Sequence, residues 1–173
     1  MSRIGLWVFL FMVPCLVGAA PAERSATIAF TGDSFGFMGF PGNPGGLAKR
    51  ALALKELRRS RPDLLVLDAG NTLSPFYISR LERGEPLFTA LDAMGYDYLN
   101  LGYHDFDFGQ DHLLALEKSV HGLKLLSANI RVAATGGAWV QETAVREIGG
   151  LRVGLIGLCH PKIAQQAVIG HFN

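Results

Sequence analysis

Apolar residues along the chain alternate between short continuous runs and longer stretches with helical spacing. Residues 27–31 are a short β-type run, and residues 64–67 are a continuous apolar run of the kind that forms a buried strand. Between them, Gly45 and Gly46 open a stretch whose apolar residues lie three or four positions apart: Leu47, Ala51, Leu54 and Leu57. The pattern therefore predicts a strand, a helix and a second strand.

The alternation continues after the second strand. Pro86 suits the first turn of a helix over residues 87–94, and Gly95 would end that helix, because proline is tolerated at a helix start and glycine favours the position after its last turn. The elements predicted next are a strand at residues 98–101, a helix at residues 111–120 and a strand at residues 123–127.

Two longer strand-like runs follow, at residues 139–148 and 151–158, and Gly149 and Gly150 separate them. Two glycines between such runs are a strong signal for a two-residue β-hairpin. Alternating strands and helices that end in a hairpin are typical of an α/β domain, here a mixed sheet with helices on one face.

Length and composition fit this class. The chain has 173 residues, of which 49% are hydrophobic and 18% are charged, and these values are typical of one globular domain. The net charge is +1, and this balance gives no electrostatic case for a nucleic acid or membrane-surface partner, since such partners usually require a basic face or run.

Polar side chains stand on three turns that follow predicted strands. These turns are residues 31–36 (TGDSFG), 67–72 (LDAGNT) and 101–109 (LGYHDFDFG). The third turn carries His104 with two nearby carboxylates, Asp105 and Asp107, which we expect to orient and stabilise the imidazole. The sequence therefore predicts one site that is assembled from several strand ends.

The three turns resemble those of the N-terminal domain of the 5'-nucleotidases, within the calcineurin-like metallophosphoesterase superfamily. In that family the three turns have the sequence motifs N-D-x-H-G, D-A-G-D-T and L-G-N-H-E-F-D-F-G, with similar spacing. The resemblance runs from about residue 27 to residue 158, with further matches at residues 45–50, 91–95, 126–130 and 153–158. It implies an αββα sandwich that hydrolyses nucleotide or other phosphoesters with divalent metal ions.

The resemblance assigns roles to the residues that are retained. Asp33 stands at a metal-ligand position of the first turn, and His104 matches the catalytic histidine of the family. Asp107 matches the aspartate that orients this histidine. Asp33 could alternatively cap the loop after its strand, as aspartate often does in turns.

Three other positions depart from the family pattern. Phe35 replaces a histidine ligand, Asn71 replaces the aspartate that bridges two metals, and Tyr103 replaces an asparagine ligand. Two catalytic metals lie roughly 3.5–4 Å apart, and a neutral amide does not offset their repulsion as a carboxylate does. We therefore expect binding of Mn²⁺ or Zn²⁺ to be weak or absent, with Asn71 a turn former that keeps a hydrogen bond. In the competing enzyme hypothesis, Asp33 and Asn71 hold one metal ion together with His104, and His104 and Asp107 stabilise the leaving group.

Two neighbouring groups have simpler readings. Asp68 is expected to bond backbone amides rather than metal. Three phenylalanines of the first turn and its continuation are expected to form an apolar loop over the former metal site: Phe35, Phe37 and Phe40. An aromatic pocket with few polar groups suits ligand binding without turnover, which is the alternative function that the sequence allows.

The first 22 residues read as a signal peptide, because Arg3 precedes the apolar residues 4–17 and small residues follow up to Ala22. Cleavage after Ala22 would leave a domain over residues 23–173, exported to the periplasm or the extracellular space and without a membrane span. It would keep Cys159 alone, as a buried thiol or as a metal ligand beside His160.

The family supplies further histidines from a second half of the domain, which follows the segment matched here. Residues 170–173 (GHFN) resemble the family's G-H-x-H only faintly and at too short a spacing. We therefore expect a domain that is incomplete at its C-terminus, with a sheet that a protein partner could cover. A split or truncated hydrolase is one form of this reading.

Overall fold

The structure is a computed structural model that describes residues 23–39 and 45–162. The predicted signal peptide, Phe40 and residues 170–173 lie outside these ranges. Four parallel strands form the central sheet in the order β1-β2-β3-β4: β1 (Ile28–Thr31), β2 (Leu65–Asp68), β3 (Tyr98–Asn100) and β4 (Lys124–Leu126).

The register places the carboxyl ends of these strands along one edge of the sheet. Thr31 pairs with Asp68, Asp68 pairs with Leu99, and Leu99 pairs with Leu125. Because the strands are parallel, the turns that follow them emerge at the same edge. This arrangement brings together the polar turns that lie far apart in the sequence.

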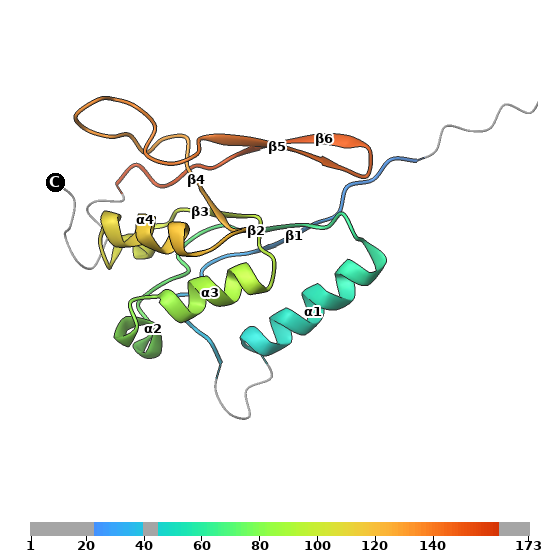
Figure 1. Ribbon diagram of the computed structural model, residues 1–173, viewed down its shortest axis with the longest axis horizontal. Coiled ribbons are helices and arrows are strands. Elements are labelled where there is room, and N and C mark those ends of the chain that lie inside the picture. The colour runs from blue at the N-terminus through green and yellow to red at the C-terminus, as the bar shows by residue number, and fades with distance from the viewer. Residues whose placement is uncertain (1–22, 40–44, 163–173) are drawn as a thin grey trace, which may run out of the picture.

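Helices cover one face of the sheet (Figure 1). They are α1 (Leu47–Ser60), α2 (Tyr77–Leu81), α3 (Glu85–Ala93) and α4 (Gln110–Ser119). A short 3-10 helix, η1 (Tyr103–Phe106), lies between β3 and α4. The main core lies between helices and sheet, and its fully buried members include Val66, Phe88, Leu91, Leu99, Leu113 and Leu125.

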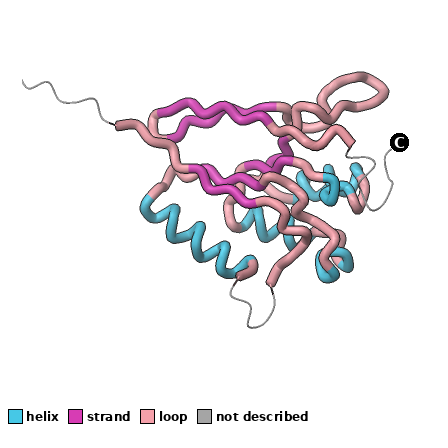
Figure 2. The backbone as a smooth tube through the Cα atoms, turned by 180° about the vertical axis from the view of Figure 1, so that it is seen from behind, coloured by secondary structure: helices cyan, strands magenta, loops and turns pink. Residues whose placement is uncertain are grey.

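An antiparallel hairpin of β5 (Thr143–Ile148) and β6 (Leu151–Ile156) lies over the other face of the sheet (Figure 2). Gly149 and Gly150 form its turn with φ values of 56° and 73°, a conformation in which glycine pays no steric cost. A second buried cluster joins the hairpin to the sheet through Leu65, Tyr98, Leu126, Ala144 and Ile148.

The predicted α/β class, the four sheet strands, three of the helices and the glycine hairpin are confirmed. The hairpin forms its own two-stranded sheet and is not part of one mixed sheet, which corrects the prediction. β5 begins at Thr143, four residues later than predicted, because Trp139 and Val140 pack against the main core in an irregular segment. The sequence pattern missed α2 and η1, which are each about one turn long.

The hairpin side of the sheet is less well covered than the helical side. Phe30 of β1 is 77% exposed and Ile156 of β6 is 67% exposed. A cavity of about 390 Å³ lies between these strands, and Leu67, Tyr98 and Leu158 contribute to its walls. Within the described ranges, no helix is long and apolar enough to cross a membrane.

Candidate functional site

Backbone hydrogen bonds join the first and second turns at the carboxyl edge of the sheet. The amide of Asp33 donates to the carbonyl of Gly70 at 2.9 Å, and the amide of Phe35 donates to the carbonyl of Asn71 at 2.8 Å. Asp33, Phe35 and Asn71 have φ values of 51°, 51° and 54°. Left-handed backbone at non-glycine residues is uncommon and concentrates at functional sites.

The second turn also packs tightly against the third. A Cβ atom added at Gly70 would lie 2.6 Å from the amide nitrogen of Gly102 and 2.9 Å from the carbonyl oxygen of Asn100. No real side chain tolerates such distances, so only glycine fits at position 70. The two backbones therefore hold each other at a fixed separation.

The buried side chain of Asp105 joins the second turn to the third. Its carboxylate accepts hydrogen bonds from the backbone amides of Asn71, Thr72, Leu73 and Gly102, at 2.7–3.0 Å. The residue is 1% exposed, and this burial raises its pKa to about 6 in spite of the amide donors. The expectation that Asp105 orients His104 is therefore wrong, because its oxygens face the backbone of both turns.

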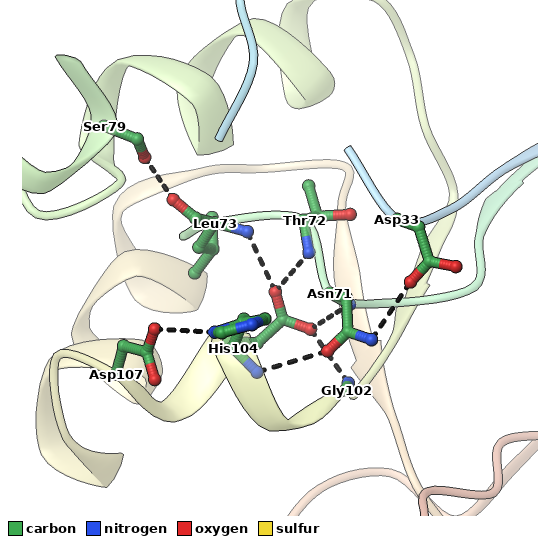
Figure 3. Close-up of polar contacts among 9 residues, drawn as sticks. Asp33, Asn71, Thr72, Leu73, Ser79, Gly102, His104 and Asp107 are labelled. Carbon is green, nitrogen blue, oxygen red and sulfur yellow. Dashed lines mark hydrogen bonds and ion pairs between the residues drawn. The ribbon is translucent and has the colours of Figure 1, made fainter. Parts of the chain in front are cut away.

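Asp107 makes the contact that the sequence predicted. Its Oδ2 lies 2.9 Å from Nδ1 of His104, and the side chains of His104 and Asp107 are 13% and 2% exposed. Because an ionised carboxylate only accepts hydrogen bonds, Nδ1 carries a proton and donates it. Nε2 is then the ring nitrogen that faces away from Asp107 (Figure 3).

Aromatic rings flank this imidazole. The ring of Phe35 meets the His104 ring edge-on, with centroids 5.5 Å apart, and the ring of Tyr103 is tilted against it at 4.3 Å. Phe37 packs against Phe76 instead, at 5.3 Å. The predicted apolar loop is thus confirmed for Phe35, while Phe37 faces the start of α2.

Asn71 connects the remaining candidates. Its Nδ2 donates to Oδ1 of Asp33 at 3.0 Å, and its Oδ1 accepts from the backbone amide of His104 at 3.2 Å (Figure 3). The predicted turn former with a hydrogen bond is confirmed at this position. The site therefore brings together all four candidate residues: Asp33, Asn71, His104 and Asp107.

Asp68 lies beneath the site, and it bonds a backbone amide, as the sequence predicted. Its carboxylate accepts from the backbone amide of Gly70 at 2.9 Å and from the hydroxyl of Thr31 at 2.6 Å. The hydroxyl of Thr72 also donates to it. These bonds fix the start of the second turn.

Cys159 is a buried thiol, which confirms one of the two readings left open for it. Its backbone amide donates to Oδ1 of Asn129 at 3.0 Å, and Nδ2 of Asn129 donates to its carbonyl at 2.7 Å. Burial raises the pKa of the thiol. Asn129 thereby joins the segment after β4 to the segment after β6, a role that the sequence pattern did not indicate.

Comparison with known proteins gives this site its context. No family model matches the chain. A 5'-nucleotidase from the venom of the snake Gloydius brevicauda is 32% identical over 117 residues, which is 65% of this chain and 20% of that protein.

Solved structures agree with this relationship. A 5'-nucleotidase precursor from Thermus thermophilus superposes with a TM-score of 0.70 at 28% identity, over 84% of this chain and 30% of that one. A calcineurin-like phosphoesterase from Bacillus subtilis has a TM-score of 0.67 at 20% identity, over 86% of this chain and 54% of that one, and it shares the fold.

The chain therefore has the fold of the calcineurin-like metallophosphoesterases. Within that class its sequence relatives are 5'-nucleotidases, and the resemblance read from the three turns is confirmed. The chain spans about a fifth of the length of the curated relatives it matches.

Metallophosphoesterases use divalent metal ions, so the donor atoms of the site can be compared with what such ions need. Asp33 offers a carboxylate, but Asn71 turns an N–H toward it and Phe35 has no lone pair. Tyr103 offers only a phenolic hydroxyl, which carries a proton of its own. Among the described residues, no group of three His, Cys, Asp or Glu side chains is placed to hold a metal ion. This set does not fit a pair of dications.

Proposed function

We propose that this protein is an exported relative of the 5'-nucleotidases in which hydrolysis of nucleotide or other phosphoesters is weak or absent. The observation that supports this proposal most strongly is the set of side chains around the His104–Asp107 pair. At the three positions where the family places metal ligands, the chain has a phenyl ring, an amide and a phenol: Phe35, Asn71 and Tyr103.

The retained pair keeps one chemical capacity. An imidazole whose Nδ1 proton is held by a buried carboxylate has a fixed ring orientation, so Nε2 can exchange a proton or a hydrogen bond with a bound phosphoester. General acid–base catalysis of this kind contributes typically 10²–10⁴-fold to a rate. It does not replace the stabilisation of phosphoryl charge that metal ions supply, which is worth several kcal/mol.

A hydrolysis assay tests this proposal. Protein comprising residues 23–173 is incubated with a 5'-nucleotide and with an aryl phosphate, each in the presence of Mn²⁺ or Zn²⁺, and His104→Ala serves as the background control. We expect release of phosphate to be barely above that control. Multiple turnover of a 5'-nucleotide that disappears in His104→Ala would refute the proposed loss of activity.

Ligand binding without turnover is the second candidate, and the aromatic contacts favour it. Phe35 and Tyr103 place two rings beside His104 at a half-buried surface, where a nucleoside or sugar could stack. Titration calorimetry with adenosine and AMP would detect such binding. A dissociation constant that Tyr103→Ala raises at least tenfold would support it, whereas no heat at millimolar ligand would exclude it.

The exposed apolar residues opposite the helices favour a protein partner as a further role. Phe30, Ile156 and Leu158 are 77%, 67% and 63% exposed and lie around one cavity. Exposed patches of this kind mark interaction surfaces or aggregation liabilities. We propose that the domain over residues 23–173 buries this face against a separate polypeptide or further sequence. Phe30→Ser should then abolish a complex found with the wild type.

Export is proposed on the strength of residues 1–22, with cleavage after Ala22. Cell fractionation followed by N-terminal sequencing would test it. Recovery of protein that begins at Glu23 from the periplasm or the medium is the expected result. Protein retained in the cytoplasm with an intact N-terminus would contradict it.

A further inference from the structure

The Asn71 amide is bonded at both ends to the other two turns. Its Nδ2 donates to Asp33 of the first turn at 3.0 Å, and its Oδ1 accepts from the His104 amide of the third turn at 3.2 Å. The backbone around this side chain is fixed as well. The backbone amide of Asn71 donates to the Asp105 carboxylate, and the backbone carbonyl of Asn71 accepts from the backbone amide of Phe35. The side chain therefore has little freedom to turn.

The neighbours also decide which end of the amide faces which turn. An ionised Asp33 only accepts hydrogen bonds, and the His104 amide only donates. Turning the amide over would set its oxygen against the Asp33 carboxylate and its NH₂ group against an N–H group, so both hydrogen bonds would be replaced by repulsion. The N–H dipole consequently points at Asp33, where it lends partial positive charge to the carboxylate.

This arrangement sets a donor where the corresponding carboxylate of a metal site would be an acceptor. Two carboxylates facing each other at this distance need a cation or a proton between them, whereas an amide and a carboxylate do not. The oxygen of Asn71 is meanwhile occupied by the His104 amide. The pair is thus complementary without an ion and presents an N–H group to any ion that approaches Asp33.

We infer that Asn71 takes the structural place of a metal ion, and that its amide holds the first and third turns together in a protein that carries no metal there. This inference rests on the proposed loss of the metal pair. His104 is then positioned through its own backbone amide and not through a bound cation. Asn71 is a positioning residue in this account, and it touches no reacting atom.

Asn71→Asp tests the inference, because it changes one NH₂ group to oxygen and places a second carboxylate against Asp33. Thermal unfolding is followed in EDTA and in Mn²⁺. In EDTA we expect the midpoint to fall by roughly 3–8 °C relative to the wild type. Added Mn²⁺ should restore at least half of that loss. The wild-type midpoint should differ by less than about 1 °C between the two conditions.

Asn129→Asp is the matched control. Asn129 also bridges two segments, through the amide and the carbonyl of Cys159, but its NH₂ group donates to a carbonyl and not to a carboxylate. Any fall in the unfolding midpoint of Asn129→Asp should therefore be the same in EDTA and in Mn²⁺. The double variant Asp33→Asn with Asn71→Asp reverses the polarity of the bond and should regain most of the wild-type midpoint in EDTA. It also covers the case in which Asn71→Asp alone fails to fold.

Three results would overturn the inference. They are a wild-type midpoint that EDTA lowers, an Asn71→Asp variant that is as stable as the wild type in EDTA, and a loss in that variant that neither Mn²⁺ nor the reversed pair restores. These readouts are separate from turnover. An active wild-type enzyme would refute the proposed function, while an unaffected Asn71→Asp midpoint would refute this inference alone.

Discussion

Two pairs of polar side chains at the same edge of the sheet differ in burial and in the kind of contact that joins them. In the His104–Asp107 pair, a carboxylate that is 2% exposed holds a ring nitrogen at 2.9 Å. In the Asp33–Asn71 pair, an exposed carboxylate meets an amide at 3.0 Å. The first pair is complementary by itself, since histidine and aspartate satisfy each other. The second pair stands at the positions for which we propose the loss of a metal ion, and a hydrogen bond from the Asn71 side chain joins the two residues.

Asp105 holds together the two turns that carry Asn71 and His104, one residue of each pair, so the largest effect is expected from Asp105→Ala. This change leaves four backbone amides without their acceptor in a buried place. Each unsatisfied group costs roughly 1–3 kcal/mol before relaxation, and we expect a net loss of about 3–5 kcal/mol in the free energy of unfolding. Chemical denaturation would measure it. A loss below 1 kcal/mol would show that the turns hold without Asp105.

The same anchor predicts a dependence on pH. Burial raises the pKa of Asp105 to about 6 in the folded protein, above the ordinary 3.8. The Asp105 carboxyl therefore binds a proton more tightly in the folded state than in the unfolded state. Its contribution to the free energy of unfolding rises as the pH falls from about 7 to about 4. We expect the wild type to gain about 1–3 kcal/mol over that window relative to Asp105→Asn. A difference in the free energy of unfolding between the wild type and Asp105→Asn that shrinks as the pH falls would contradict this. It would mean that the four amide donors lower the pKa of Asp105 by more than burial raises it.

Introducing the residues that the family motif has at the substituted positions should create a metal site at the second pair. The triple variant combines Phe35→His, Asn71→Asp and Tyr103→Asn. We expect its affinity for Mn²⁺ to exceed that of the wild type by about 10–100-fold, or roughly 1.4–2.7 kcal/mol, as measured by titration calorimetry. Phe35→His alone serves as the control. No gain in the triple variant would place the deficit in ligands that lie outside these three turns.

The smallest effects should separate the two pairs directly. Asp107→Ala removes a charge-assisted bond at a buried site, and we expect it to cost about 2 kcal/mol of stability. Asp33→Ala removes an exposed bond and should cost about 0.5–1 kcal/mol. Urea unfolding of both variants at pH 7 would compare them. Equal costs would mean that burial does not distinguish the pairs.

The fold could be predicted well from the sequence because its elements depend on local patterns. Apolar runs gave the sheet strands, and the helical spacing after Gly46 gave α1. The glycine pair gave the turn of the hairpin. η1 was missed because one turn of helix has too few residues to show a period. The place of the hairpin was also missed, since its separation from the sheet depends on packing of Ala144 and Ile148 against Leu65.

The proximity of the four candidate residues could be predicted from the sequence, whereas only some of their contacts could be. His104 and Asp107 lie three residues apart on one turn, so their contact could be anticipated from spacing. The role of Asp105 could not be inferred from its neighbourhood to His104, because its four donors come mostly from residues 71–73 of another turn. One sequence signal was available: an acidic residue three positions after Gly102 is placed to accept the Gly102 amide at the start of a helical turn.

Metal stoichiometry of the purified wild-type protein tests the central claim most directly. Protein comprising residues 23–173 is equilibrated with excess Mn²⁺ or Zn²⁺, passed through a desalting column and analysed by mass spectrometry for bound metal. We expect less than one equivalent of either ion per chain. Two tightly held ions per chain, lost when Asp33 is changed to alanine, would contradict the account.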